Sequence, residues 1–175
     1  RFKSVSCLFT ASILFPMQIS AAVSDYDALV IEARGGNSAP LLRYLEDQGK
    51  KSALTPNQVA DWLQVSSWVE NNDKTTIEIW QRYRGQMDVP ARGKVAAARA
   101  YRNQKNWNDS LAVWERVLQE EPDNVDVRTG WIMTLADARY NQQALTEANK
   151  WAQAHPGADS DALLAYVYHS QGKNW

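Results

Sequence analysis

The chain has 175 residues, of which 45% are hydrophobic and 22% charged, with 19 lysines and arginines against 20 aspartates and glutamates. This is the composition of an ordinary globular protein with enough apolar residues for one domain-sized core. A formal net charge of −1 leaves no basic footprint, so we do not expect nucleic acid as a partner. Few glycines and prolines, and no long strand-like alternation, favour an all-helical fold.

The first 22 residues have the three-part form of a secretory signal peptide. Arg1 and Lys3 precede an apolar run over residues 5–17, and small residues follow for a cut after Ala22. The run is shorter than the roughly 20 residues of a membrane span, so an uncleaved N-terminal anchor is the less favoured alternative. Because Cys7 is the only cysteine and lies in this leader, the mature chain is predicted to have no disulfide, zinc–cysteine site or cysteine nucleophile.

Two short helices are predicted next, over residues 23–56. Ser24 can cap the first, and Gly35-Gly36 can end it. Ser38 with Pro40 opens the second, which Gly49 is expected to end. This hairpin fits the repeat pattern that follows poorly, so we interpret it as an atypical capping unit, which solenoids need to cover an apolar end.

Residues 57–90 form the first predicted repeat. Thr55 can cap its first helix, Pro56 suits the first helical position, and Gln58 can complete a capping box. Asp73 is expected to cap the partner helix.

The clearest unit covers residues 91–124 and resembles a tetratricopeptide (TPR) repeat, a helical hairpin with a period of about 34 residues. Asn108 is expected to cap its second helix, and Lys94 stands where the TPR pattern has a tryptophan. Small residues, Ala98 and Ser110, fall where its two helices cross. The aromatic residues predicted to pack in the core of this unit and its neighbours are Trp80, Tyr101, Trp107, Trp114 and Trp151.

A step of 34 residues takes Pro122 to Pro156 and Trp114 back to Trp80, which supports the period. Residues 125–158 are therefore a further repeat, and residues 159–175 the first helix of another that Trp175 cuts short. We predict an all-α, TPR-type solenoid with a right-handed superhelix, and expect the chain to be part of a longer protein.

No catalytic constellation is found: the sequence lacks the zinc-protease helix motif, the phosphate-cradling glycine loop and the nucleophile elbow. His155 and His169 have no carboxylate or second ligand at metal spacing. We therefore predict no enzyme activity, no cofactor and no metal site.

In a TPR solenoid the first helix of each repeat lines a concave surface that commonly binds extended ligands. Residues seven apart share a helix face, as do residues three or four apart. The binding candidates at inward-facing positions are Asp61, Trp68, Arg92, Arg99, Arg102 and Asp126, and Asn103 and Asp137 are expected to lie beside them. Two readings of the arginines stay open. They can grip a carboxylate or an acidic partner, or they can pair with acidic residues of the adjacent repeat.

Four phrases in this order, YDALVIEARGGN, QVADWLQVSSW, VPARGKVAAARAYRNQKNWNDSLAVWE and TLADARYNQQAL, resemble the N-terminal periplasmic part of the bacterial outer-membrane exporters of poly-β-1,6-N-acetylglucosamine. The likeness covers approximately residues 26–175. It implies a periplasmic TPR domain that precedes a C-terminal β-barrel pore, docks a periplasmic deacetylase and guides partly de-N-acetylated polymer outwards.

The acidic binding candidates agree in part with a partly de-N-acetylated polymer as the ligand. Without Arg1 and Lys3 the chain has 17 basic and 20 acidic residues, a formal charge of −3. Such a surface, with Asp61, Asp126 and Asp137, attracts the ammonium groups of de-N-acetylated units. The alternative is a general TPR adaptor in envelope assembly that binds protein segments and no glycan.

Overall fold

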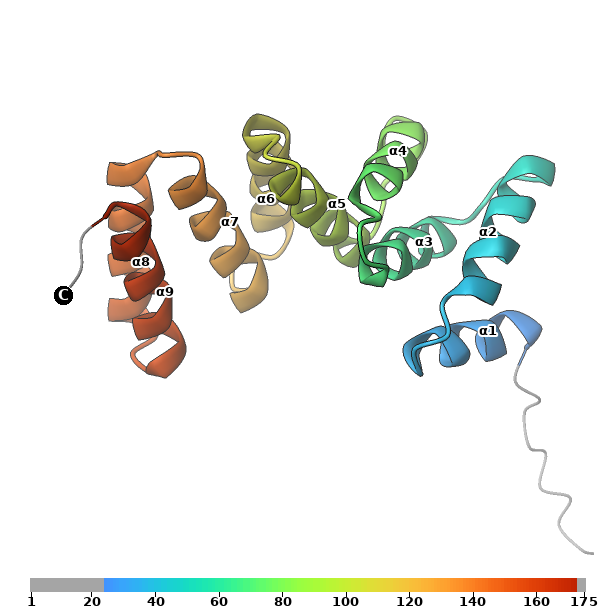
Figure 1. Ribbon diagram of the computed structural model, residues 1–175, viewed down its shortest axis with the longest axis horizontal. Coiled ribbons are helices and arrows are strands. Elements are labelled where there is room, and N and C mark those ends of the chain that lie inside the picture. Colours follow the sequence, from blue (N-terminus) through green and yellow to red (C-terminus); the bar gives the residue numbers. More distant parts are fainter. Residues whose placement is uncertain (1–23, 173–175) are drawn as a thin grey trace, which may run out of the picture.

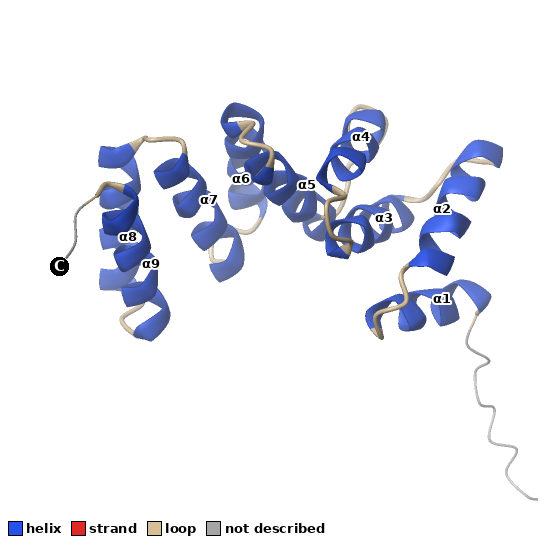
Figure 2. Ribbon diagram, in the orientation of Figure 1, coloured by secondary structure: helices blue, strands red, loops and turns tan. Residues whose placement is uncertain are grey.

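The computed structural model describes residues 24–172, and there it consists of helices and loops (Figures 1 and 2). The predicted signal peptide, Cys7 and the last three residues lie outside this range. In chain order the helices are α1 (Asp25–Arg34), α2 (Ala39–Lys51), α3 (Pro56–Trp68), α4 (Asp73–Tyr83), α5 (Ala91–Asn103), α6 (Trp107–Glu120), α7 (Val125–Asp137), α8 (Asn141–Ala154) and α9 (Ala158–Ser170).

These helices stack as consecutive hairpins that curve into an arch (Figure 1). Each even-numbered helix from α2 to α8 packs between the odd-numbered helices that precede and follow it. Among the odd-numbered helices, α3 also packs on α5, and α7 on α9. The prediction of an all-helical repeat solenoid is thereby confirmed. None of the helices within residues 24–172 has both the length and the apolar character needed to cross a membrane.

Several helix starts are capped by side chains, and the caps at Ser24 and Thr55 are those predicted. The Ser24 hydroxyl accepts a hydrogen bond from the Asp27 N–H, and Asn124 accepts one from the Val127 N–H. Thr55 and Gln58 form the predicted capping box with both bonds made. Such reciprocal bonds satisfy donors that a helix N-terminus otherwise leaves open.

Three predicted boundaries are wrong. Asn72 rather than Asp73 precedes α4, and Asn108 lies inside α6, which begins at Trp107. The turn before α6 is tight, because Lys105 has a positive φ of 60° and the Asn106 N–H bonds to the Tyr101 carbonyl, so the helix starts early. Gly49 does not end α2, which continues to Lys51.

Gly49 instead serves the packing of α2. A β-carbon there would lie 3.1 Å from the Tyr83 hydroxyl oxygen and 3.5 Å from the Trp62 ring. The glycine therefore lets α2 approach these two aromatic side chains, and its helix-ending tendency is overridden by tertiary contact.

The core runs along the whole arch and contains three of the five predicted aromatics fully buried: Trp80, Tyr101 and Trp114. Trp151 is partly buried and packs against the core, whereas Trp107 is partly buried but does not belong to it, which corrects the prediction for Trp107. Ser110 donates to the Ala98 carbonyl at 2.7 Å, as close helix crossing requires. Trp114 donates to the Thr134 hydroxyl at 3.0 Å and so joins α6 to α7.

Lys94 is 1% exposed at the position where a TPR repeat has tryptophan. Its ammonium group donates to Asp88 at 3.0 Å and to Glu120 of α6. The Lys94 hydrogen bond and charge, with a smaller contribution from Arg116, hold the pKa of Asp88 below its usual value. The aliphatic stem thus fills the tryptophan site while the charge reaches carboxylates at the surface.

Candidate functional site

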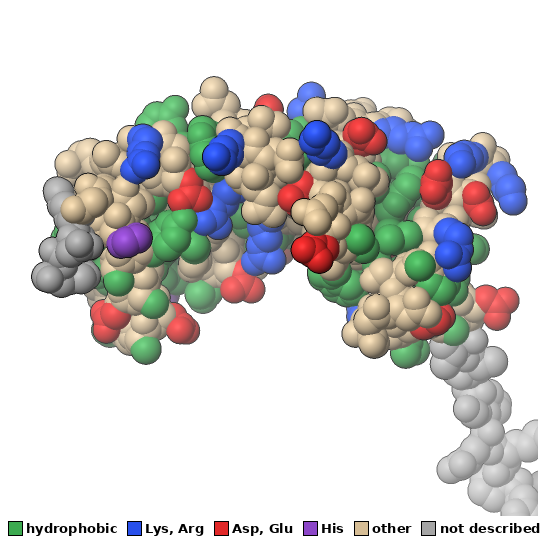
Figure 3. Space-filling model, viewed as in Figure 1, with side chains coloured by type: hydrophobic (Ala, Val, Ile, Leu, Met, Phe, Trp, Pro, Cys, Tyr) green, Lys and Arg blue, Asp and Glu red, His purple; other side chains and the backbone are tan. Residues whose placement is uncertain are grey.

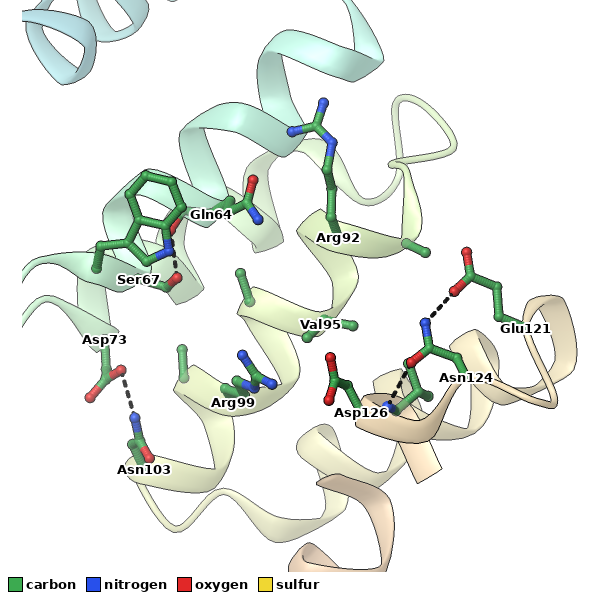
Figure 4. A pocket seen from close by; sticks show the side chains of 15 residues that line it. Gln64, Ser67, Asp73, Arg92, Val95, Arg99, Asn103, Glu121, Asn124 and Asp126 are labelled. Carbon is green, nitrogen blue, oxygen red and sulfur yellow. Dashed lines mark hydrogen bonds between the residues drawn. The ribbon is translucent and has the colours of Figure 1, made fainter. Parts of the chain in front are cut away.

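A groove lies between α3, α5 and the start of α7, with a volume of about 430 Å³ (Figure 4). It exists because α5 packs closely on α3 and on α6 but touches α7 sparsely. The space-filling view shows the underside of the arch hollowed (Figure 3). The polar and aromatic residues that line the groove are Gln64, Ser67, Trp68, Asp73, Arg92, Arg99, Asn103, Glu121, Asn124 and Asp126.

Trp68 is the aromatic side chain of this groove. It is the last residue of α3, where the helix gives way to an extended residue at Val69, and it remains 48% exposed. A large exposed indole is unusual in a chain that buries Trp62, Trp80 and Trp114. Tryptophan presents a broad apolar face together with one donor, so Trp68 offers a surface on which a flat, partly apolar ligand can pack.

Arg99 of α5 and Asp126 at the start of α7 both line the groove (Figure 4). Both are exposed, and neither makes a hydrogen bond or ion pair with another residue between positions 24 and 172. They are therefore the charged candidates whose side chains are free to meet a ligand.

The polar rim of the groove is fixed by side-chain amides. Asn103 donates to Asp73 at 3.1 Å, and Asn124 donates to Glu121 at 2.7 Å. Neither carboxylate is neutralised by a cation within residues 24–172. Together with Asp126 they give the groove three uncompensated carboxylates against the single unpaired guanidinium of Arg99, so its field is acidic.

Arg92 is the other arginine of the groove, and its charge is already balanced. Its guanidinium pairs with Asp61 of α3, whose carboxylate also accepts a hydrogen bond from the Tyr26 hydroxyl of α1. A chain of three side chains thereby connects α1, α3 and α5. Burial of the hydroxyl and its hydrogen bond to Asp61 raise the pKa of Tyr26, so this tyrosine stays a donor.

A second chain of the same chemistry lies at the other end of α5. Arg102 donates to Asp137 of α7 at 2.6 Å and to the Tyr166 hydroxyl of α9 at 2.9 Å, while Tyr166 donates to Asp137. Burial, then the hydrogen bond to Asp137, raise the pKa of Tyr166. We call these two sets the Tyr26 triad (Tyr26, Asp61, Arg92) and the Tyr166 triad (Arg102, Asp137, Tyr166).

The structure thus divides the eight candidates. Trp68, Arg99, Asn103 and Asp126 meet in the groove together with Arg92. Asp61, Arg92, Arg102 and Asp137 bind side chains of neighbouring helices, which is the second of the two readings left open for the arginines. Arg99 alone of the three arginines keeps a free guanidinium within the described part of the chain.

Sequence reasoning missed Glu121 and Asn124, which belong to the groove. Both lie in the loop between α6 and α7, outside the helix faces from which candidates were chosen. In the sequence, an asparagine that caps a helix three residues after an acidic residue looks the same whether or not it also lines a binding groove. Residues 24–172 contain no group of three or more histidine, cysteine, aspartate or glutamate side chains placed to hold a metal ion.

The amino-acid sequence of the chain is similar to that of one kind of known protein. The chain is 44% identical over 172 residues to the poly-beta-1,6-N-acetyl-D-glucosamine export protein of Escherichia coli strain K12, and equally to that of Escherichia coli O157:H7. The chain is a relative of this export protein. The resemblance predicted from the sequence is thereby confirmed.

The match extends over 95% of this chain but over only 20% of the export protein. The chain therefore spans about a fifth of the length of these relatives. No model of a known protein family matches the chain. No solved structure matches it either.

Proposed function

We propose that this chain is a periplasmic scaffold of an exporter of partly de-N-acetylated poly-β-1,6-N-acetylglucosamine, and that its groove holds the polymer on the way to the outer membrane. The observation that carries the proposal is 44% identity to the export protein along almost the whole chain. The likeness is too extensive for shared helical repeats alone, because repeat residues are unspecific and the matched phrases include loops.

The groove supplies chemistry that suits this ligand. De-N-acetylated glucosamine units carry ammonium groups, which three uncompensated carboxylates attract, most directly the free carboxylate of Asp126. The apolar face of a sugar ring can pack on the exposed indole of Trp68. Arg92 and Arg102 do not oppose a cationic polymer, since their charges are paired with Asp61 and Asp137.

The remaining parts of the proposal concern the whole protein. A signal peptide over residues 1–22 delivers the chain to the periplasm, the repeats dock the polysaccharide deacetylase, and the polymer continues to an outer-membrane pore. These parts rest on the family resemblance. The free guanidinium of Arg99 is the feature of the groove that favours an acidic protein surface as a second ligand.

The test is calorimetric titration of the purified chain with partly de-N-acetylated β-1,6-glucosamine oligomers. Binding is expected, weakening with added salt because screening reduces the attraction between charges. Asp126→Asn is expected to weaken it severalfold. Asp47→Asn is the control, because Asp47 is an exposed carboxylate on α2, outside the groove.

A pull-down with the deacetylase tests the docking separately.

Glycan binding that Asp126→Asn and Asp47→Asn change alike would place the polymer outside the groove. A folded chain that binds the deacetylase and no oligomer would refute the glycan proposal and leave the protein adaptor as the function.

A further inference from the structure

A second cavity lies beyond the Tyr166 triad, between the start of α6 and the last turns of α7 and α9. Its volume is about 440 Å³. The side chains that line it are Trp107, Ala136, Asp137, Arg139, Tyr166, His169 and Ser170. We call it the Trp107 cavity. The sequence pattern assigned Trp107 to the core and therefore gave no reason to expect a site here.

The groove and the Trp107 cavity are both lined by residues of α7, at its two ends. About three helical turns separate Asp126 from Asp137 on α7, so both residues lie on one face of that helix. They are roughly 16 Å apart at 1.5 Å per residue. Asp137 lines the Trp107 cavity and pairs with Arg102 of α5, which lies three residues after Arg99 of the groove.

The two sites differ in charge. In the Trp107 cavity the Asp137 carboxylate is compensated by Arg102 and also accepts the Tyr166 hydroxyl. Arg139 adds a guanidinium that is held in place by the Ser170 carbonyl. No uncompensated carboxylate lines this cavity, whereas three line the groove. An ammonium group is therefore favoured in the groove and disfavoured beside Arg139.

The Trp107 cavity has groups that suit a neutral sugar. Trp107 is half-buried, and its indole N–H has no hydrogen-bond partner within residues 24–172. The exposed imidazole of His169, in the last turn of α9, also lines the cavity. An aromatic face with a few convergent polar groups is the usual composition of a small-ligand site.

From this difference we propose that the Trp107 cavity is a subsite for N-acetylated, uncharged hexosamine units, while the groove at Asp126 takes de-N-acetylated, charged units. The inference rests on the proposed function and adds a specificity to it. One strand of polymer that follows α7 meets both subsites, so a partly de-N-acetylated chain satisfies both and a uniform chain satisfies one.

The test compares fully N-acetylated with fully de-N-acetylated β-1,6 oligomers on the parent chain and two variants. Trp107→Ala is expected to weaken binding of the acetylated oligomer about tenfold and leave the de-N-acetylated one unchanged. Asp126→Asn is expected to weaken binding of the de-N-acetylated oligomer and to leave binding of the acetylated one unchanged. Tyr140→Ala is the matched control, because Tyr140 is 47% exposed and lines neither site.

A second measurement uses the parent chain, in case Trp107→Ala perturbs the start of α6. In ¹⁵N spectra the indole cross-peak of Trp107 is expected to shift with the acetylated oligomer, and that of Trp68 with the de-N-acetylated one. If the acetylated oligomer binds but leaves the Trp107 peak in place, or if Trp107→Ala weakens both oligomers equally, the inference is overturned. If neither oligomer binds the parent chain, the proposed function fails with it.

Discussion

Replacing Gly130 with alanine tests the contact between α6 and α7, on which the position of Asp126 depends. Gly130 lies in the interior of α7 against the fully buried Trp114. A β-carbon there would lie 2.5 Å from two atoms of the Trp114 ring and 3.0 Å from a third. A rigid buried ring cannot yield as the end of a flexible side chain can, so the helices must separate.

The magnitude follows from three contributions. Overpacking in a core costs about 1–3 kcal/mol. Distorting the Trp114–Thr134 hydrogen bond costs a further 0.5–1.5 kcal/mol or so. Alanine is a better helix former than glycine by about 1 kcal/mol, which offsets part of the loss. We expect Gly130→Ala to lower the free energy of unfolding by about 2 kcal/mol, or roughly 4–8 °C in Tm for a domain of this size.

The assay is thermal and urea unfolding followed by circular dichroism at 222 nm. Gly85→Ala is the control, because a β-carbon at Gly85 meets no atom within 4 Å and its φ is not positive. We expect this variant to match or slightly exceed the parent in stability. If Gly130→Ala were as stable as Gly85→Ala, the close approach of α7 to Trp114 would not exist in solution.

Two further predictions concern Lys94. Lys94→Ala leaves a cavity and is expected to lower the free energy of unfolding by about 2–4 kcal/mol. Lys94→Met fills the site and is expected to lower it by less than about 1.5 kcal/mol. Equal losses for the two variants in urea unfolding would show that the ion pairs, not the packed stem, stabilise the site. Because the pKa of Asp88 is lowered in the folded chain, its contribution to stability is present above its unfolded pKa and is lost as pH falls through the folded value. Unfolding is measured at a series of pH values for the parent and Asp88→Asn. The parent is expected to be the more stable of the two near neutral pH, and this difference is expected to shrink below about pH 4. A difference that stayed constant down to about pH 2 would show that the Asp88–Lys94 ion pair does not stabilise the fold.

Helix positions could be predicted because their signals are local. Thr55, Pro56 and Gln58 determine a helix start within four residues, and the structure makes both bonds of the box. Gly49 shows where local signals fail: its tendency to end a helix is outweighed by the closeness of Tyr83 and Trp62, which lie in other helices. Contacts of that kind depend on long-range packing that one sequence does not display.

The candidate site was predictable in part for the same reason. Helical spacing placed Trp68, Arg99 and Asp126 on the inner faces of their helices, and all three line the groove. Spacing cannot tell which charges are already paired. Asp137 and Arg102 meet across two helices, so only the packed structure shows that they balance each other. Trp107 was misassigned because the repeat pattern gives the residue type at a turn but not its exposure.

The two triads also bear on how the array arose. They contain the same three residue types in opposite chain order, Tyr-Asp-Arg from α1 to α5 and Arg-Asp-Tyr from α5 to α9. Duplication of a repeat carries each side chain to the equivalent position of the next unit, yet Asp61 lies in the middle of α3 and Asp137 at the end of α7. The triads are therefore not copies of each other. Both triads end on α5, so this one helix ties α1 and α3 on one side to α7 and α9 on the other.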